Sequence, residues 1–476
     1  MSVDTLFISV PFTDTVAPLM APAIMKSIAT KAGMTSAALD LNIETRNKIL
    51  SSDNKDAIID FLKNGYMADS AASEIFDIMN YMLTRIVSYS PRIVGISVFT
   101  YDCMWATKYL CYMIKKYDPS IKIVLGGSGL FYNLNSSDTD AKSLLENNFI
   151  DLFIKGDGEK TLFDYLSNNI IQDGGNSITW TQMTNKDLSE LPIPNYDDYN
   201  FTFYERKVLP VLGSRGCVRN CDFCDIHVHW KKFTYRTGQS IFDEMIELST
   251  KHGIYDFKFG DSLINGNQKE YKALMQLIAK HNESSENKIT WSSFFIFRPK
   301  TQMSEEDWRL TALGGGQHLL VGIESLDDDV RSKLGKKFTN DDIEFGLQMA
   351  KKYGIKFIFL FLIGHIYENQ HHIDSAIEWW KAHDEYKDTI ELVNLGTPLG
   401  ILDGTYLHQN FDKLNLRWVG RTQQDWANEN SDPQIRLRWY KDLSSTIKEV
   451  GFTEVHPFDN HFIMERMGKN GSILTS

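Results

Sequence analysis

The sequence VLPVLGSRGCVRNCDFC occupies residues 208–224 and decides how the rest of the chain is interpreted. The apolar run at 208–213 is typical of a buried strand, and a glycine-containing turn follows it. Directly after that turn, Cys217, Cys221 and Cys224 have the spacing C-x3-C-x2-C. Three thiolates on one short loop can surround a soft metal centre. The stretch therefore predicts a metal-binding loop at the carboxyl end of a strand.

Apolar runs and amphipathic segments alternate in the residues that follow this loop. Six strand-and-helix units in about 190 residues predict an incomplete barrel, smaller than the eight-fold one. In such a barrel the active residues are expected at the carboxyl ends of the strands. We assign residues 206–404 to this barrel. The predicted strands are 208–213, 255–261, 289–295, 318–325, 355–364 and 390–396, and the predicted helices are about 239–252, 268–281, 305–313, 339–353 and 370–386.

The residues before the loop show the same alternation. It predicts an α/β domain in residues 1–172, with a doubly wound, Rossmann-like parallel sheet. Residues 173–205 are polar with little periodicity and are predicted to be a linker. Residues 405–476 are predicted to be a mainly helical C-terminal extension with one clear helix at about 433–450. The expected N-terminal strands are 5–10, 36–41, 93–100, 121–127 and 151–157, and the helices are 18–32, about 54–89, 104–117 and 159–169.

Composition excludes several other classes of protein. The chain has 476 residues and a formal charge of −12, which argues against a non-specific nucleic-acid binder. No run of about 18 apolar residues predicts a membrane span. The N-terminus lacks the pattern of a signal peptide, so we expect a cytoplasmic protein. Five cysteines, an odd number, argue against a disulfide framework, and Cys103 and Cys111 are expected in the core.

The cysteine loop alone leaves two kinds of metal centre open. Structural zinc takes four ligands, and His227 or His229 could supply the fourth. An iron–sulfur cluster also binds closely spaced thiolates, with four for a fully ligated [4Fe–4S] cluster. Three cysteines would leave one iron open to an external ligand. That arrangement favours reactivity over a purely structural role.

The C-x3-C-x2-C motif after the first strand of a partial barrel resembles the signature of the radical S-adenosylmethionine (SAM) superfamily. The resemblance implies that Cys217, Cys221 and Cys224 bind a [4Fe–4S] cluster whose open iron is chelated by SAM. An external electron donor such as flavodoxin or ferredoxin would reduce the cluster. SAM would then be cleaved to methionine and a 5′-deoxyadenosyl radical, which abstracts hydrogen from substrate.

Further positions are similar to family motifs. Phe223 resembles the residue that contacts adenine, and Gly260-Asp261-Ser262 resembles the segment that contacts the SAM amino group. Arg298 resembles an arginine that binds the SAM carboxylate, and Glu324 matches a position that contacts the ribose. IGHIYE at 363–368 resembles a later family motif. These matches imply a SAM site along the strand ends.

The N-terminal domain resembles the cobalamin-binding domain that precedes many radical SAM barrels. The resemblance rests on several segments, including residues 93–127 and 151–166. It implies that Thr100 and Tyr101 lie near the corrin edge and that Gly126 and Gly127 let the nucleotide tail pass. The loop after the first strand, residues 11–16, has no histidine. Any bound cobalamin should therefore lack a histidine ligand from this domain.

Together these resemblances imply a cobalamin-dependent radical SAM enzyme that methylates an unactivated carbon. The substrate would be a small molecule or a peptide, and no catalytic residue is assigned. If the N-terminal domain is degenerate, the expected chemistry is cyclisation, rearrangement or oxidation. The alternative from another class is a non-catalytic, zinc-stabilised binding protein.

Overall fold

A computed structural model describes residues 2–131, 140–168 and 179–455 of the chain. The chain divides into two compact units, Met1–Lys207 and Val208–Ser476. Each unit is built around its own parallel sheet, and each is described by itself. None of the helices in the described ranges is long and apolar enough to cross a bilayer.

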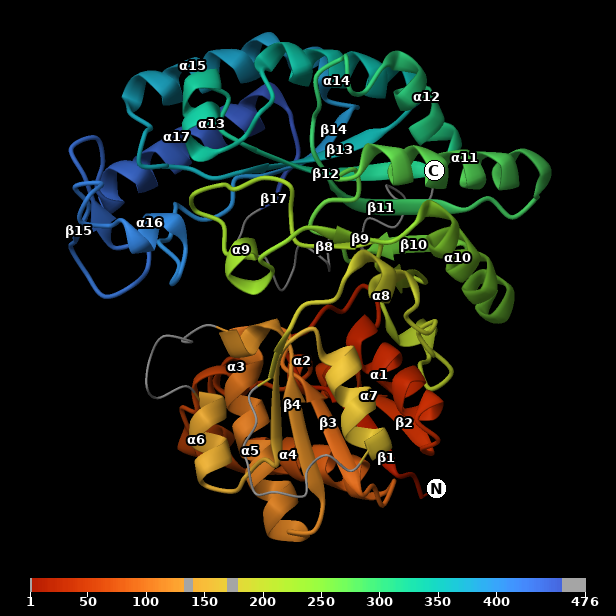
Figure 1. Ribbon diagram of the computed structural model, residues 1–476. Helices are drawn as coiled ribbons and strands as arrows, with labels where there is room; N and C mark the ends of the chain where they lie inside the picture. The colour runs from red at the N-terminus through yellow and green to blue at the C-terminus, as the bar shows by residue number, and fades with distance from the viewer. Residues whose placement is uncertain (1, 132–139, 169–178, 456–476) are drawn as a thin grey trace. The chain divides into compact units, whose positions relative to one another are not determined.

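The sheet of the first unit is parallel, as predicted (Figure 1). Its order, β2-β1-β3-β4-β5-β6, is that of a doubly wound fold, and β1 pairs with both β2 and β3. Successive strands are added on one side of β1 and then, from β3 onwards, on its other side. Ligands of such folds bind at this switch point, between β1 and β3. The strands are β1 (Thr5–Ser9), β2 (Ser36–Asp40), β3 (Ile93–Ser97), β4 (Lys122–Gly126), β5 (Leu152–Gly156) and β6 (Thr179–Thr181).

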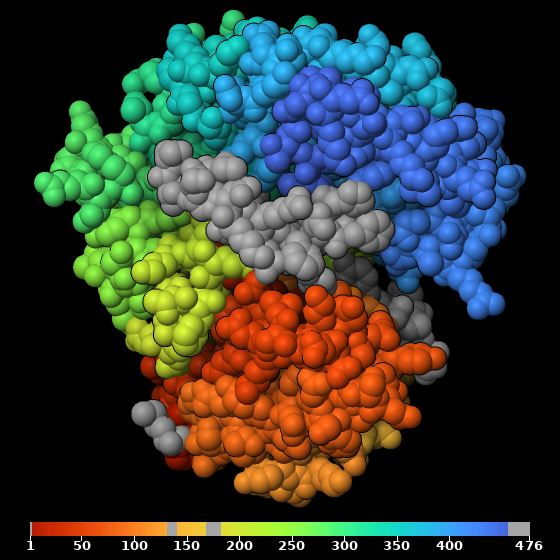
Figure 2. Space-filling view, turned by 180° about the vertical axis from the view of Figure 1, so that it is seen from behind, coloured from red at the N-terminus to blue at the C-terminus, as the bar shows by residue number. Residues whose placement is uncertain are grey.

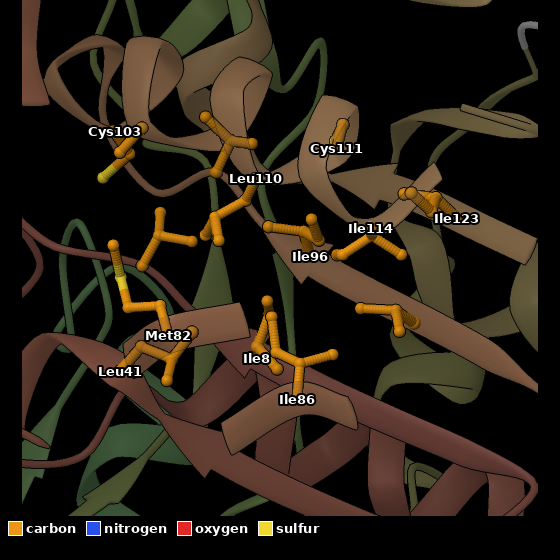
Figure 3. Packing of buried hydrophobic residues seen from close by; sticks show 14 of the residues in the cluster. Ile8, Leu41, Met82, Ile86, Ile96, Cys103, Leu110, Cys111, Ile114 and Ile123 are labelled. Carbon is orange, nitrogen blue, oxygen red and sulfur yellow. The ribbon is translucent and has the colours of Figure 1, made fainter. Parts of the chain in front are cut away.

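Helices cover both faces of this sheet (Figure 1). The predicted helix at 54–89 is two helices, because Gly65 ends the first with a left-handed φ of 78°. Cys103 and Cys111 are buried in the larger core, as expected (Figure 3). One face carries α1 (Met20–Lys31) and α7 (Gly158–Asn168), and the other carries α2 (Leu41–Leu50), α3 (Lys55–Asn64), α4 (Ala72–Val87), α5 (Met104–Tyr117) and α6 (Asp140–Glu146).

The second half of the predicted linker is folded onto this first unit. It contains α8 (Asn185–Ser189), which begins with a capping box formed by Thr184 and Asp187. Asp198 accepts hydrogen bonds from Lys26 Nζ at 2.5 Å and from the backbone N–H of Ala38 at 2.7 Å. These bonds tie the segment to α1 and β2.

The sheet of the second unit has its strands in sequence order and parallel, which confirms the partial barrel. Its order is β7-β10-β11-β12-β13-β14-β17 (Figure 1). The last strand was not predicted, because its two residues are too few for a period. The strands are β7 (Leu209–Val211), β10 (Asp256–Phe259), β11 (Thr290–Phe295), β12 (Gly316–Glu324), β13 (Lys356–Phe361), β14 (Ile390–Asn394) and β17 (Glu454–Val455).

The helices between these strands lie close to their predicted positions because the sequence supplies their caps. Ser304 and Asp307 form a capping box at α12, and Thr339 and Asp342 form one at α14. A short helix, α13, was not predicted. The helices are α10 (Gly238–His252), α11 (Gln268–Ser284), α12 (Glu305–Leu313), α13 (Asp328–Leu334), α14 (Asn340–Tyr353), α15 (Gln370–Ala382) and α17 (Pro433–Val450).

The C-terminal extension packs on the barrel through α17, whose predicted bounds are confirmed. Its surface adjoins that of α15 (Figure 2). Arg436 is fully buried, with its guanidinium 3.8 Å from the Trp426 ring centre. Its side chain also lies against Gly364, where any Cβ would clash with it. The smaller elements are β8 (Ser214–Arg215), α9 (Ile226–His229), β9 (Thr234–Tyr235), α16 (Tyr406–Gln409), β15 (Arg417–Trp418), β16 (Trp426–Ala427) and the 3-10 turns Asp69–Ala71, Tyr101–Cys103, Ser128–Phe131, Phe201–Phe203 and Asp384–Tyr386.

Candidate functional site

The cysteine loop leaves the carboxyl end of β7, where the sequence places it. The antiparallel pair β8 and β9 closes its base. Gly216 at this base has φ 78°, and a Cβ there would lie 2.8 Å from the carbonyl oxygen of Lys232. Within the loop, the N–H of Cys224 donates to the carbonyl of Cys221 at 3.1 Å, and the N–H of Arg219 donates to Cys217 Sγ at 3.4 Å. The loop therefore turns on itself, and one of its backbone N–H groups points at the Cys217 sulfur.

The three cysteines are free thiols of intermediate exposure. Burial raises the pKa of Cys221 to about 11 and that of Cys224 to about 12. Thiolates at such positions need a nearby cation, which a bound metal supplies. Within the described ranges, no three histidine, cysteine or acidic side chains converge on one metal ion. Structural zinc takes four protein ligands, whereas a [4Fe–4S] cluster held by three thiolates keeps one iron open, so a set of three cysteines fits such a cluster better than structural zinc.

Neither neighbouring histidine completes a zinc site within the described part of the chain. Both histidines lie on the short helix α9, directly after the cysteine loop. The Nε2–H of His227 donates to the carbonyl oxygen of Arg219 in the cysteine loop. His229 Nε2 lies 3.5 Å from the Asp225 carboxylate.

The segment Gly260-Asp261-Ser262 lies at the end of β10, as predicted, but its carboxylate faces the neighbouring strand. Asp261 is buried and accepts hydrogen bonds from the N–H of Gly213 at 2.7 Å and from Ser214 Oγ at 2.5 Å. Burial raises the pKa of Asp261 to about 6. Its carboxylate thus supports the turn that carries the cysteine loop.

Arg298 lies just after β11 and keeps an uncompensated charge. Its Nε and Nη2 donate to the carbonyl oxygen of Asn265, and Nη2 also donates to Gly266 O at 3.0 Å. Its Nη1 donates to the amide oxygen of Gln302 at 3.1 Å. All these acceptors are neutral. Burial, and secondly the nearby charge of Arg219, lower the pKa of Arg298 to about 10. A bound anion would offset both the burial of this charge and its repulsion from Arg219.

Glu324 ends β12 in a conformation unusual for a residue with a side chain, with φ 64°. The pairing of β12 with β13 shifts register between Gly322 and Glu324. Its carboxylate is paired with Lys336, at 2.9 Å from Oε1 to Nζ, and the two side chains are 13% and 10% exposed. Strained backbone of this kind gathers at functional sites.

Phe223 belongs to the cysteine loop, and its ring faces the 363–368 turn. Its ring meets that of His365 edge-on, with the centroids 6.3 Å apart. Glu368 is buried and accepts from the backbone N–H groups of Gly364 and His365 and from Ser325 Oγ. Burial raises the pKa of Glu368. The 363–368 turn is therefore held by its own glutamate.

Sequence reasoning missed two contacts with the cysteine loop. His365 Nε2 lies 2.9 Å from Asp222 Oδ1, and His365 is fully buried. The N–H of Asp222 donates to the carbonyl of Leu334 at 3.1 Å, which brings the end of α13 against the loop. The family-like segment at 363–368 was a usable signal for the contact of His365, whereas nothing in the sequence indicated the contact of Leu334.

In the first unit, the predicted residues lie at the carboxyl ends of β3 and β4. Tyr101 and its neighbour Phe99 are 47% and 43% exposed, which leaves an apolar surface at this edge. Gly127 has φ 112°, and a Cβ there would lie 2.3 Å from the Val98 carbonyl oxygen. A Cβ at Gly126 would have no atom nearer than 3.9 Å. Gly127 is thus required by the fold itself, while Gly126 leaves open space beside the edge.

The loop after β1 shapes the other side of the same edge. Asn42 accepts from the N–H of Phe12 at 2.9 Å and donates to the carbonyl oxygens of Thr13 and Asp14. Thr100 Oγ1 lies 3.5 Å from Cys103 Sγ, which fixes the start of α5. These neutral groups and exposed rings fit a large, flat and mostly apolar ligand.

Residues 211–379 match the family model of the radical SAM superfamily. The chain carries a radical SAM domain. The matched residues include β7, the cysteine loop and the strand ends that carry Asp261, Arg298 and Glu324. A radical SAM domain implies a [4Fe–4S] cluster and SAM as cofactors.

The sequence is similar to proteins named as methyltransferases. One is an uncharacterized methyltransferase of Pyrococcus horikoshii, 25% identical over 63% of this chain and 66% of that protein. Another is cytidylyl-2-hydroxyethylphosphonate methyltransferase of Streptomyces wedmorensis, 22% identical over 58% of each. The chain thus spans less than two thirds of the length of either relative.

Solved structures share the fold over most of the chain. The radical SAM methyltransferase TsrM of Kitasatospora setae, with cobalamin and a [4Fe–4S] cluster bound, matches with a TM-score of 0.63 at 16% identity. That match covers 97% of this chain and 90% of TsrM. The cobalamin-dependent radical enzyme OxsB, with aqua-cobalamin bound, matches with a TM-score of 0.61 at 15% identity, over 87% of this chain and 55% of OxsB. At these identities the likeness establishes the fold.

Proposed function

We propose that this protein is a cobalamin-dependent radical SAM enzyme that methylates an unactivated carbon of a small-molecule or peptide substrate. The observation that carries the proposal is the three-cysteine loop at the carboxyl end of β7, inside the matched domain. The fold shared with cobalamin-binding enzymes and the methyltransferase names of the relatives support it. When bound, the cluster and SAM supply a 5′-deoxyadenosyl radical, and cobalamin supplies the methyl group.

In this proposal, the residues of the barrel hold the cluster and SAM. Cys217, Cys221 and Cys224 bind three irons. Phe223 stacks against adenine, Glu324 accepts hydrogen bonds from the ribose, and Arg298 binds the SAM carboxylate through a charge-assisted hydrogen bond. Gly260 and Ser262 flank the amino-group contact, and Asp261 positions the loop through Gly213 and Ser214.

We assign cobalamin to the first unit. Residues 1–172 would be the cobalamin-binding domain, joined by residues 173–205 to a barrel of residues 206–404 and an extension of residues 405–476. Thr100 and Tyr101 would border the corrin, and Gly126 would leave room for the nucleotide tail. The exposed rings beside them and the switch between β1 and β3 support this placement.

The proposal also includes a partner and a location. A one-electron donor such as flavodoxin or ferredoxin would reduce the cluster, because no group described in this chain supplies that electron. A cytoplasmic location would give access to such donors.

The test is cofactor analysis of protein produced anaerobically with cobalamin supplied. We expect a brown protein with about four irons and bound cobalamin that forms 5′-deoxyadenosine from SAM after reduction. A colourless protein with one zinc would overturn the proposal in favour of a binding protein. SAM cleavage by protein that takes up no cobalamin would remove methyl transfer and leave cyclisation, rearrangement or oxidation.

A further inference from the structure

Lys336 is a buried cation that the proposed SAM chemistry does not use. Its Nζ donates to Glu324 Oε1 at 2.9 Å and to the carbonyl oxygen of Gly322 at 2.8 Å. Its side chain is 10% exposed. A Cβ added to Gly322 would displace the charged ends of both side chains, so the glycine leaves room for the pair.

The segment that carries Lys336 is packed directly against the cysteine loop. The carbonyl of Leu334 accepts the N–H of Asp222 at 3.1 Å. Gly335 has φ 101°, and a Cβ there would lie 3.1 Å from the Cα of Cys221. These two backbone contacts fix where the segment sits relative to the proposed cluster ligands. The end of α13 is therefore packed against the loop.

The ammonium group keeps its charge in this position. The Glu324 carboxylate, 2.9 Å from its Nζ, stabilises the charged form of Lys336. Lys336 and Glu324 thus place two fixed, opposite charges beside the cysteine loop. Charges near an iron–sulfur cluster set its reduction potential, and burial strengthens their effect.

We propose that the Lys336–Glu324 pair sets the reduction potential of the cluster, with Lys336 as a positioning residue that also holds Glu324 for the ribose. This inference rests on the proposed function. In the reduction step, one electron passes from the flavodoxin or ferredoxin donor to the [4Fe–4S]²⁺ cluster, which becomes [4Fe–4S]⁺. The added negative charge is stabilised by the Lys336 ammonium and destabilised by the Glu324 carboxylate. Removing each charge should therefore shift the potential in opposite directions.

The test is potentiometric titration of the SAM-free cluster, followed by electron paramagnetic resonance. We expect Lys336→Met to make reduction roughly tenfold less favourable, a shift of about 59 mV to more negative potential. Glu324→Gln should shift the potential the opposite way, and the double variant should return towards wild type. Lys336→Arg should stay near wild type because it keeps the charge.

The matched control is Lys337→Met, which removes the same charge from the exposed neighbouring residue. The reduction potential of the cluster in this variant should equal that of wild type, because solvent screens the charge of Lys337. Equal potentials in wild type, Lys336→Met and Glu324→Gln, all with full iron content, would overturn the inference. Shifts of the same sign in both variants would also overturn it, since a merely structural role predicts no sign. If wild type binds no cluster, the proposed function fails instead.

Discussion

The imidazole of His365 lies 2.9 Å from the carboxylate of Asp222, and the two residues are 143 positions apart in the sequence. Asp222 stands between Cys221 and Cys224, and His365 belongs to the turn after β13. The contact therefore ties the cysteine loop across the carboxyl edge of the barrel sheet.

Replacing His365 with Ala should loosen the loop without removing a ligand. The buried Asp222 carboxylate would lose its partner, which costs about 1–3 kcal/mol. We expect a lower thermal unfolding midpoint and faster loss of iron to a chelator. His365→Gln, which can still donate to Asp222, is the control and should fall between wild type and the alanine variant. Chelation rates equal to wild type in His365→Ala would show that the contact does not anchor the loop.

Alanine at Cys217, Cys221 or Cys224 should abolish the cluster and SAM cleavage. Each thiolate is expected to hold one iron, and three is the number that leaves one iron open. Iron content and the optical spectrum measure this result. Cys103→Ala and Cys111→Ala are the controls, since both side chains are buried in the first unit's core. A full complement of iron in any one of the three loop variants would contradict the assignment.

Glu324→Ala and Arg298→Ala should weaken SAM binding and leave the iron content intact. A charge-assisted hydrogen bond contributes about 1.5–3 kcal/mol, which corresponds to a roughly ten- to over a hundred-fold loss of affinity. Equilibrium binding of SAM to the oxidised protein measures the effect. Arg309, exposed and paired with Glu306 on α12, provides the control variant Arg309→Ala. Unchanged affinity in both test variants would mean that SAM binds elsewhere.

Asp261 should make stability depend on pH. Burial raises the folded-state pKa of Asp261 to about 6 from a usual value of 3.8. The folded state then binds more protons than the unfolded state. The contribution of Asp261 to the free energy of unfolding is therefore full below the unfolded-state pKa and falls as the pH rises to about 6. The loss is about 3 kcal/mol over the whole window and about 2 kcal/mol between pH 4.5 and pH 7. The free energy of urea unfolding at pH 4.5 and pH 7 measures it. Asp261→Asn should have a flatter profile, and an identical profile would show that Asp261 does not titrate there.

Much of the fold could be predicted because its signals are local. Apolar strand runs and helix caps such as Ser304 with Asp307 need only neighbouring residues. The cysteine spacing likewise located the loop. Short elements failed, as α9 and α13 show, since four or seven residues give no clear period.

The missed site residues have a different physical cause. Lys336 lies beside the loop only because α13 turns at Gly335, and one lysine among many in the sequence carries no such signal. The orientation of Asp261 was also beyond prediction, because the donors to its carboxylate, Gly213 and Ser214, come from a distant part of the sequence, just after β7. Tertiary contacts of this kind decide which charged side chains point towards a cofactor and which support the backbone.

The cobalamin assignment is tested most directly by electron paramagnetic resonance of anaerobically purified, cobalamin-loaded protein after reduction. The account predicts two signals: a [4Fe–4S]⁺ signal that changes when SAM is added, and a cob(II)alamin signal without coupling to a histidine nitrogen. The absence of histidine from the loop after β1 is the basis of the second expectation. A histidine nitrogen coupling at cobalt, or cluster and SAM signals with no cob(II)alamin bound, would contradict the account.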